Sequence, residues 1–311
     1  MMFDKIVERL NKFSVGLRAE YEARDLDFKD QSTTYNYYRW NYFPSAALSY
    51  KINDKSNIYT SFARKIDRFR GYYLRPTAIK TGANTYFQGN PNLRPRLVNT
   101  LELGWSNTFK KSTSLSIEAF YKYNTDDFQF ISSNFLDSVS IINRPYNIGN
   151  SQDIGVETSL SFKPVKWLSA DVMGTVSYYS QKGSFNDEVI ESESFRWRAR
   201  FNTYFTITKT TKIQFSGRYN SKQVNSFTTS SENLDFSLGV RQSFLKRALN
   251  LTFNMRNVFY TAKRDSETIY DDYYYSKNTE MIWPQLEIGL SYKINNFKQS
   301  RRVTEDGGGD F

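Results

Sequence analysis

The chain has 311 residues and a formal net charge of +10, and it contains neither cysteine nor histidine. Without these two residue types it can build no disulfide framework, no Ser-His-Asp or Cys-His machinery and no Cys- or His-ligated metal site. We therefore predict that it is not an enzyme and carries no cofactor or metal. Its Lys and Arg residues are spread among Asp and Glu, so nucleic acid is not a predicted partner.

Aromatic residues are abundant, with 25 Phe and 23 Tyr. Such residues suit a pleated sheet better than a helix, so an all-β fold is predicted. The mean hydropathy of −0.63 is polar, and we find no run of about 18 apolar residues that could cross a bilayer as a helix. A membrane β-barrel remains open, because its strands turn only alternate residues to lipid.

The N-terminal residues 1–12 read MMFDKIVERLNK. Early acidic residues and the lack of a long apolar stretch are unlike a secretory signal peptide. For an outer-membrane protein this start would mean that the sequence is a fragment of a longer gene; otherwise the membrane interpretation is wrong. We expect a separate segment over 1–12, a barrel domain over 13–297 and a polar, Gly-rich tail over 298–311.

Strict alternation of apolar and polar residues is the main signal along the chain. Between Phe195 and Ile207 the odd positions are mostly apolar, whereas the even positions carry Arg, Asn, Tyr and Thr. An amphipathic helix has a different period, so long strands with one apolar and one polar face are predicted. The same period of two recurs over 13–22, 115–122, 213–220 and 286–294.

Turn signals divide the chain into about twelve predicted strands, many of them longer than the roughly 9 to 11 residues that span a bilayer. Short turns alternate with longer connections, as periplasmic turns and extracellular loops do. Aromatic clusters such as Tyr72-Tyr73 and Tyr178-Tyr179 favour an aromatic girdle at the membrane interfaces. The predicted strands are 13–28, 35–51, 56–70, 96–110, 113–131, 139–163, 167–183, 193–208, 211–226, 231–246, 248–270 and 277–296. The longer connections are predicted at 29–34, 71–95, 132–138, 184–192, 227–230 and 271–276.

Three stretches resemble motifs of a known family. Residues 89–102 read GNPNLRPRLVNTLE, residues 120–127 read FYKYNTDD, and residues 147–157 read NIGNSQDIGVE. They are similar to the barrel domain of TonB-dependent receptors, in the outer-membrane β-barrel branch common in Bacteroidetes. Arg96 stands where that family usually has an acidic residue. The prolines of the first motif fix backbone φ and stiffen the descent from the loop, a role that needs no ligand.

The last predicted strand also resembles this family. Gly289 followed by Tyr292 and Ile294 looks like the C-terminal β-signal that the barrel-assembly machinery recognises. The whole resemblance implies an antiparallel transmembrane β-barrel in the outer membrane of a Gram-negative bacterium. Such receptors form barrels of about 22 strands, so about twelve strands would be part of one, with the plug domain missing.

The resemblance also implies a function and partners. Receptors of this kind take up a scarce nutrient, such as siderophore-bound iron, a glycan or a peptide, with energy passed through TonB. The implied partners are the plug domain, TonB, the barrel-assembly machinery, outer-membrane lipid and lipopolysaccharide, and a small-molecule, glycan or peptide ligand.

Ligand contacts are expected in and near the longest connection, because exposed aromatic and Arg side chains on loops often carry recognition. An uncommitted polar loop would have the same sequence character. The candidate residues are Arg64, Arg68, Arg70, Tyr72, Tyr73, Arg75 and Tyr86.

Two other functions remain open. A stand-alone outer-membrane barrel of about twelve strands would act as a pore or porin-like channel. A soluble β-sheet module that binds carbohydrate or protein would need a second sheet to cover its apolar face.

Overall fold

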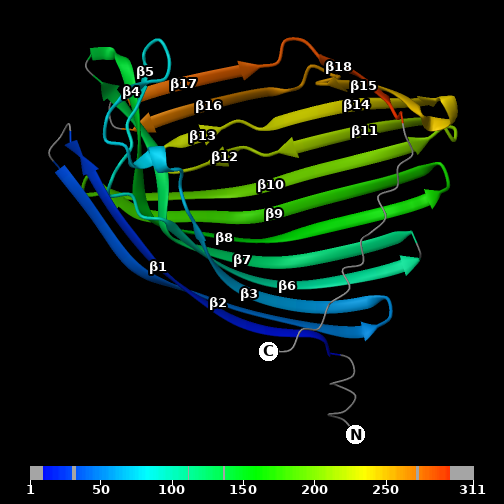
Figure 1. The fold of residues 1–311 in the computed structure, drawn as a ribbon, viewed down its shortest axis with the longest axis horizontal. Coiled ribbons are helices and arrows are strands. Elements are labelled where there is room, and N and C mark those ends of the chain that lie inside the picture. Colours follow the sequence, from blue (N-terminus) through cyan, green and yellow to red (C-terminus); the bar gives the residue numbers. More distant parts are fainter. Residues whose placement is uncertain (1–9, 30–32, 111, 136, 271–272, 295–311) are drawn as a thin grey trace, which may run out of the picture.

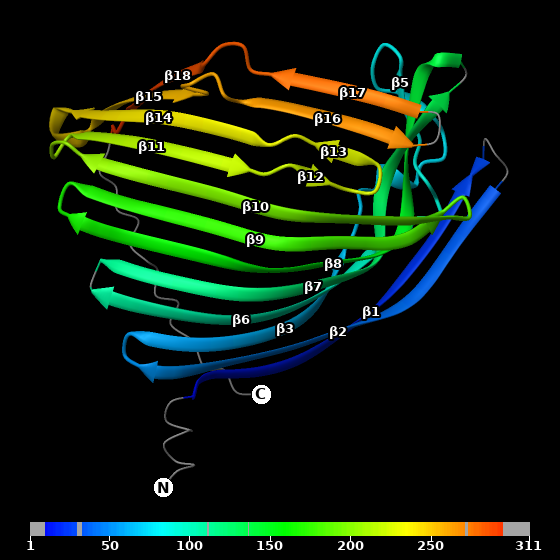
Figure 2. The same cartoon turned by 180° about the vertical axis from the view of Figure 1, so that it is seen from behind.

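The alternating sequence forms one long, strongly curved antiparallel sheet (Figures 1 and 2). The structure is a computed structural model that describes residues 10–29, 33–110, 112–135, 137–270 and 273–294. Within these residues the sheet runs in the order β1-β2-β3-β6-β7-β8-β9-β10-β11-β14-β15-β18, and β4 and β5 lie off this path. The path ends at β1 on one side and at β18 on the other, so the sheet is an open trough.

The strands of the main path follow one another in chain order, and the path passes over only the elements between β3 and β6, between β11 and β14 and between β15 and β18. Its strands are β1 (Leu10–Phe28), β2 (Thr33–Asn53), β3 (Ser56–Asp67), β6 (Arg96–Lys110), β7 (Thr113–Phe135), β8 (Asp137–Val165), β9 (Leu168–Phe185), β10 (Glu188–Thr206), β11 (Thr211–Asn220), β14 (Asn233–Phe244), β15 (Leu249–Arg256) and β18 (Gln285–Tyr292). The prediction of an all-β fold with about twelve long strands is confirmed for this path.

The remaining elements gather at the end of the trough where the connections are long. They are η2 (Gly71–Leu74), β4 (Ile79–Lys80), β5 (Thr85–Phe87), and a second sheet made of β12 (Gln223–Val224), β13 (Thr228–Ser230), β16 (Lys263–Tyr270) and β17 (Tyr273–Glu280). The turn η3 (Leu245–Arg247) lies at the opposite end, between β14 and β15. No helix among the described residues is long and apolar enough to cross a membrane.

Three predicted strands are wrong because the chain leaves the strand inside them. The prediction over 248–270 is split into β15 and β16, the prediction over 277–296 takes in the end of β17 and all of β18, and the prediction over 211–226 is split into β11 and β12. Asn257 causes the first break: its φ is +54°, and its buried side chain accepts a bond from the Ala262 amide and donates to the Met281 carbonyl. Asn tolerates this left-handed backbone better than most residues.

The predicted loop over 184–192 is also wrong. Strands β9 and β10 continue to Phe185 and from Glu188, and only Asn186 and Asp187 connect them, with φ of +50° and +65°. Two left-handed residues of these types make a tight hairpin turn. Near its tip each face of the hairpin mixes polar and apolar residues, with Val189 exposed and Ile190 buried, so the alternation that marks the other strands is absent here.

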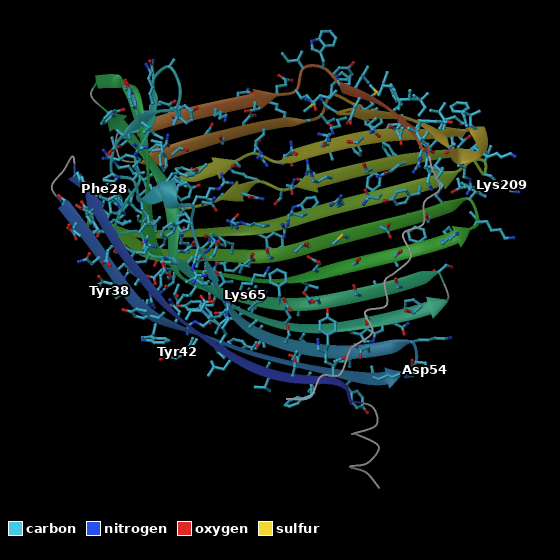
Figure 3. The ribbon with its side chains drawn as sticks, viewed as in Figure 1. Phe28, Tyr38, Tyr42, Asp54, Lys65 and Lys209 are labelled. Atoms are coloured by element: carbon cyan, nitrogen blue, oxygen red, sulfur yellow. The ribbon has the colours of Figure 1, made fainter. Side chains whose placement is uncertain are left out.

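The two faces of the trough differ as predicted. The convex face exposes large apolar side chains, among them Val15, Leu17 and Trp40. In Figure 3 Tyr38 and Tyr42 lie on the outside of the curve, whereas Lys65 lies inside it. The register pairs Glu20 with Asn41 and continues around the concave face with polar residues. The aromatic girdle is wrong for two of its clusters, because Tyr72, Tyr73 and Tyr179 make contacts in the loop or on the concave face.

Burial is concentrated at the end with the long connections. A hydrophobic cluster of Ile131, Ile148, Ile190 and Phe227 lies there, where the connection after β11 packs across β7, β8 and β10. Strand β8 comes very close to β9 at the same end: Gly149 has a φ of +143°, and a Cβ on its partner Gly183 would lie 1.6 Å from the Ile148 carbonyl oxygen. Only glycine allows this close approach.

We predict that Gly183→Ala destabilises the fold by about 1–3 kcal/mol, because the new methyl group would push β8 and β9 apart. The measurement is the urea unfolding midpoint of the chain refolded in detergent. Gly174→Ala, on the same strand but with open space around its Cβ, is the matched control and should leave the midpoint unchanged or slightly higher. Equal midpoints for the two variants would contradict this account.

Candidate ligand-binding site

A pocket of about 440 Å³ opens on the concave face near the long connections. It is formed by side chains from β6 to β10 and from the connection that carries β12 and β13. A concave site with a few converging polar groups and aromatic walls is the usual form of a small-molecule site. The lining residues are Arg96, Asn124, Asp127, Phe128, Gln129, Phe130, Ser151, Tyr179, Arg196, Asn225 and Thr228.

A β-bulge in β7 places two carboxylates at this site. The register shifts between Asn124 and Asp127, and Asp126 has a φ of +55°. Such a bulge changes the direction of successive side chains. Asp126 forms ion pairs with Arg39 at 3.2 Å and with Arg94 at 3.0 Å, away from the pocket lining. Asp127 is the residue that faces the pocket.

Asp127 organises the buried floor of the pocket. Its side chain is 6% exposed, and its Oδ1 lies 3.0 Å from Arg96 Nη1. Its Oδ2 accepts a hydrogen bond of 2.6 Å from Ser151. Arg96 also pairs with Asp67, so two carboxylates match its one charge. Arg96 is therefore a structural cation that joins β3, β6 and β7.

Arg196 is a different kind of cation. Its guanidinium lies 3.7 Å from the centre of the Tyr179 ring and donates to the Val224 carbonyl and to Asn225 Oδ1 at 3.0 and 2.7 Å. The groups that contact the guanidinium are neutral, and its buried Nε has no hydrogen-bond partner among the described residues. The Asp153 carboxylate acts on it electrostatically, but none of the printed contacts of Arg196 is with a carboxylate. A half-buried guanidinium whose hydrogen bonds go to neutral groups can still pair with an anionic ligand.

An aromatic cluster connects the longest connection to the pocket wall. The Tyr73 ring centroid lies 5.1 Å from that of Phe130 and 5.7 Å from that of Phe87, and Tyr72 lies 4.5 Å from Tyr73. A hydrogen bond with Tyr72 raises the pKa of the Tyr73 phenol, which therefore stays neutral at neutral pH. Because Phe128 and Phe130 also line the pocket, Tyr73 contacts the outside of its wall, and Tyr72 packs behind Tyr73.

The other predicted contact residues are not brought to this pocket. Arg68 pairs with Glu20 and Glu22 on β1, and Tyr86 packs on Phe135 at 5.0 Å. Arg70 and Arg75 are exposed, and their backbone carbonyls accept bonds within the connection. Arg64 lies in β3 opposite Asn99, half-buried, with an Nε that has no hydrogen-bond partner among the described residues.

The structure brings in residues that the prediction of ligand contacts missed. Arg196 and Tyr179 come from strands far from the longest connection in the sequence, and Asp127 needs the bulge to reach the pocket. The alternation does place Arg196 on the polar face. That signal was present in the sequence, but it did not distinguish Arg196 from Arg198 and Arg200 next to it.

The residues of the family-like motifs have structural roles here. Leu93 is fully buried, and Asn147 accepts a bond from the Arg94 amide and donates to the Arg94 carbonyl. Asn90 donates to the Pro145 carbonyl. These hydrogen bonds hold the long connection against β8. They give residues of the first motif, 89–102, a structural role. The predicted assembly signal lies on the edge strand: Gly289 and Tyr292 are in β18, and Ile294 follows it with 89% of its surface exposed.

Known proteins share this architecture. The model of the outer membrane protein beta-barrel family matches residues 5–292. Among solved structures, the siderophore receptor PiuA from Acinetobacter baumannii superposes with a TM-score of 0.61 at 14% identity over 90% of this chain and 40% of that chain. The FrpB iron transporter (F3-3 variant) from Neisseria meningitidis gives 0.56 at 14% over 90% and 43%. The siderophore receptor PirA from Pseudomonas aeruginosa gives 0.54 at 13% over 81% and 47%.

These likenesses show a shared fold, and the chain spans less than half the length of each of these three structures. A search of curated proteins finds no match.

We predict that Asp127→Asn lowers the stability of the refolded chain by about 1–3 kcal/mol, because Arg96 and Ser151 lose a buried charged partner. The thermal unfolding midpoint in detergent measures this. Asp54→Asn removes a carboxylate that is 92% exposed and paired with Lys51, and it should leave the midpoint nearly unchanged because solvent screens the pair. A similar loss in both variants would show that Asp127 has no special structural role.

Proposed function

Because the chain belongs to the outer membrane protein beta-barrel family, we propose that it forms part of the barrel of a TonB-dependent receptor that takes up an anionic iron chelate. The family confirms the predicted location, the outer membrane of a Gram-negative bacterium. The convex apolar face is then the lipid-facing wall, and the concave polar face lines the lumen.

The observation that carries the proposed substrate class is Arg196 in its pocket. The guanidinium makes its hydrogen bonds and its ring contact with neutral groups, and the aromatic rings of Tyr179, Phe128 and Phe130 surround the same space. An iron(III) chelate with several catecholate rings is both anionic and aromatic, so one end of this pocket can pair with its charge and the other can stack on its rings. The names of the solved relatives, siderophore receptor and iron transporter, support this class.

The lumenal wall also supports the proposal that a plug domain occupies the trough. Like charges stand directly opposite each other on neighbouring strands of the concave face: Glu118 faces Glu157, and Arg200 faces Arg218. Such pairs destabilise a sheet. Arg218 is already paired with Asp235 on β14 at 3.6 Å, so the acidic pair on β7 and β8 gives the stronger support. A folded domain with a matching basic patch would relieve it.

The two alternatives have less support. A stand-alone pore needs a closed barrel, whereas the described path is open between β1 and β18. A soluble module would cover its apolar face with a second sheet, whereas Leu17, Trp40 and Ile288 are exposed on the convex face. Both features are expected of part of a larger membrane barrel.

We expect Arg196→Gln to weaken binding of an anionic iron(III) tris-catecholate complex by about tenfold to a hundredfold, the loss expected for a charged hydrogen bond. Quenching of tryptophan fluorescence in the detergent-refolded chain measures the affinity. Arg196→Lys keeps the charge and should recover part of it, and Arg218→Gln, elsewhere on the lumenal wall, should bind as the parent does. Equal binding by the Gln variant, or a preference for a cationic iron(III) hydroxamate complex, would disprove the proposed substrate class.

A second prediction concerns the lumenal charges. Glu157→Gln should stabilise the isolated chain by about 0.2–1 kcal/mol, because it removes the repulsion from Glu118 and still accepts the Thr175 hydrogen bond. The urea unfolding midpoint measures the gain. Glu191→Gln, which loses an exposed ion pair with Lys182, should show no gain. An unchanged midpoint for Glu157→Gln would mean that solvent already screens the pair and that it gives no evidence for a partner.

A further inference from the structure

A second hollow, of about 220 Å³, lies at the opposite end of the trough from the ligand pocket. In Figure 3 Lys209 marks this end together with Asp54, whereas Phe28 and Tyr38 mark the end with the long connections. Four of the lining residues are cations and none is acidic. The lining consists of Lys209, Thr210, Lys212, Arg241, Ser243, Arg247 and Asn250.

The fold brings these cations together against electrostatic repulsion. Lys212 on β11 stands directly opposite Arg241 on β14, on the same face of the sheet. Like charges in this position destabilise a sheet. The lining offers no carboxylate to either of them, so an anion bound in the hollow would remove the repulsion.

The backbone beside the hollow is strained. Leu245, Lys246 and Arg247 have consecutive φ angles of +48°, +52° and +73°. Left-handed backbone is unfavourable for residues other than glycine because the Cβ comes too close to the following carbonyl oxygen. Arg247 Nη2 donates to the Lys209 carbonyl at 3.1 Å, and the Ser243 amide donates to the Thr210 carbonyl at 2.9 Å. These bonds tie two short turns together and hold Arg247 at the hollow, where backbone strain often accompanies a functional role.

Apolar side chains lie on the other side of the same turns. Ile207, Phe244 and Leu245 are 56%, 46% and 66% exposed. Because the convex face of this family lies in lipid, these side chains reach the acyl region near one membrane surface. Lys209 and Arg247 lie in the turns at the rim, and Lys212 and Arg241 lie just inside it, on the same face of the sheet as Arg218. A headgroup therefore reaches the hollow by bending over the rim. A lipid beside this rim would meet an apolar wall for its chains and a cationic hollow for its headgroup.

We propose that this hollow binds the phosphate group of an anionic phospholipid, whose acyl chains lie against Phe244 and Leu245. Lys212, Arg241 and Arg247 supply N–H donors to the phosphate oxygens. The site is separate from the Arg196 pocket, and the proposal does not depend on the ligand proposed there.

The test uses the full chain refolded in nonionic detergent and native mass spectrometry to count bound lipid. We expect phosphatidylglycerol to bind at least about fivefold better than phosphatidylcholine, whose phosphate charge is neutralised by its own headgroup. The double variant R241Q/R247Q should lose about tenfold or more of this affinity. The double variant K55Q/K166Q removes two exposed charges from other short turns and is the matched control, so it should bind as the parent does.

Competition with inorganic phosphate shows whether the hollow binds the phosphate group of a lipid or free phosphate. If the lipid is the ligand, millimolar phosphate should not displace phosphatidylglycerol, and Leu245→Asn should weaken lipid binding while every strand keeps its sequence. Displacement by phosphate alone would overturn the lipid assignment. Equal lipid binding by R241Q/R247Q and K55Q/K166Q would overturn the site. If R241Q/R247Q does not refold, as judged by gel mobility before and after heating, the single variant R247Q, whose substitution lies in a turn, is compared with the control instead.

Discussion

Strand register is the constraint on which the rest of this structure depends. Side chains alternate between the two faces, so a slip of one residue in any strand pair would move a whole set of arginines from the lumen to the lipid-facing wall. The register pairs Arg200 with Arg218 and Phe201 with Gly217, which separates charged from apolar residues across a single sheet. Lipid contact on the convex face and water or a folded partner on the concave face both require this separation.

The end with the long connections adds contacts that a regular sheet cannot supply. A bulge at Asp126 and Asp127 sends one carboxylate to Arg39 and Arg94 and the other to Arg96 and Ser151. The long connection between β3 and β6 is thereby anchored over the trough, and the Tyr73 cluster meets the pocket wall. Rigid anchoring of a binding loop reduces the ordering that a ligand must otherwise impose.

The two ends of the trough contain cations of different character. Arg196 is held by Tyr179 and Asn225 inside a pocket with aromatic walls, which suits a ligand with rings and a dispersed negative charge. Lys212, Arg241 and Arg247 stand on or just inside an open rim next to exposed apolar residues, which suits a compact oxyanion that belongs to a lipid. Arginine is thus proposed to bind an iron chelate at one end and a lipid phosphate at the other, and the groups around each guanidinium account for the difference.

The sequence by itself determined the all-β class, the long alternating strands and their approximate number, because a period of two is a local property of each strand. The family was indicated by the resemblance of the motifs at 89–102, 120–127 and 147–157. The sequence also predicted that Pro91 and Pro95 have a structural role. It did not reveal the breaks at Asn257 and at 186–187, where a buried amide or a left-handed turn overrides the pattern.

Only the tertiary structure decided which polar residues meet. Tyr73 was predicted from the loop and contacts the pocket wall, but Arg68 turns to Glu20 on β1, and Arg196 comes in from β10. The alternation marks several arginines as equivalent, and they become different through the curvature of the sheet, the bulge in β7 and the contacts made by connections that are distant in sequence.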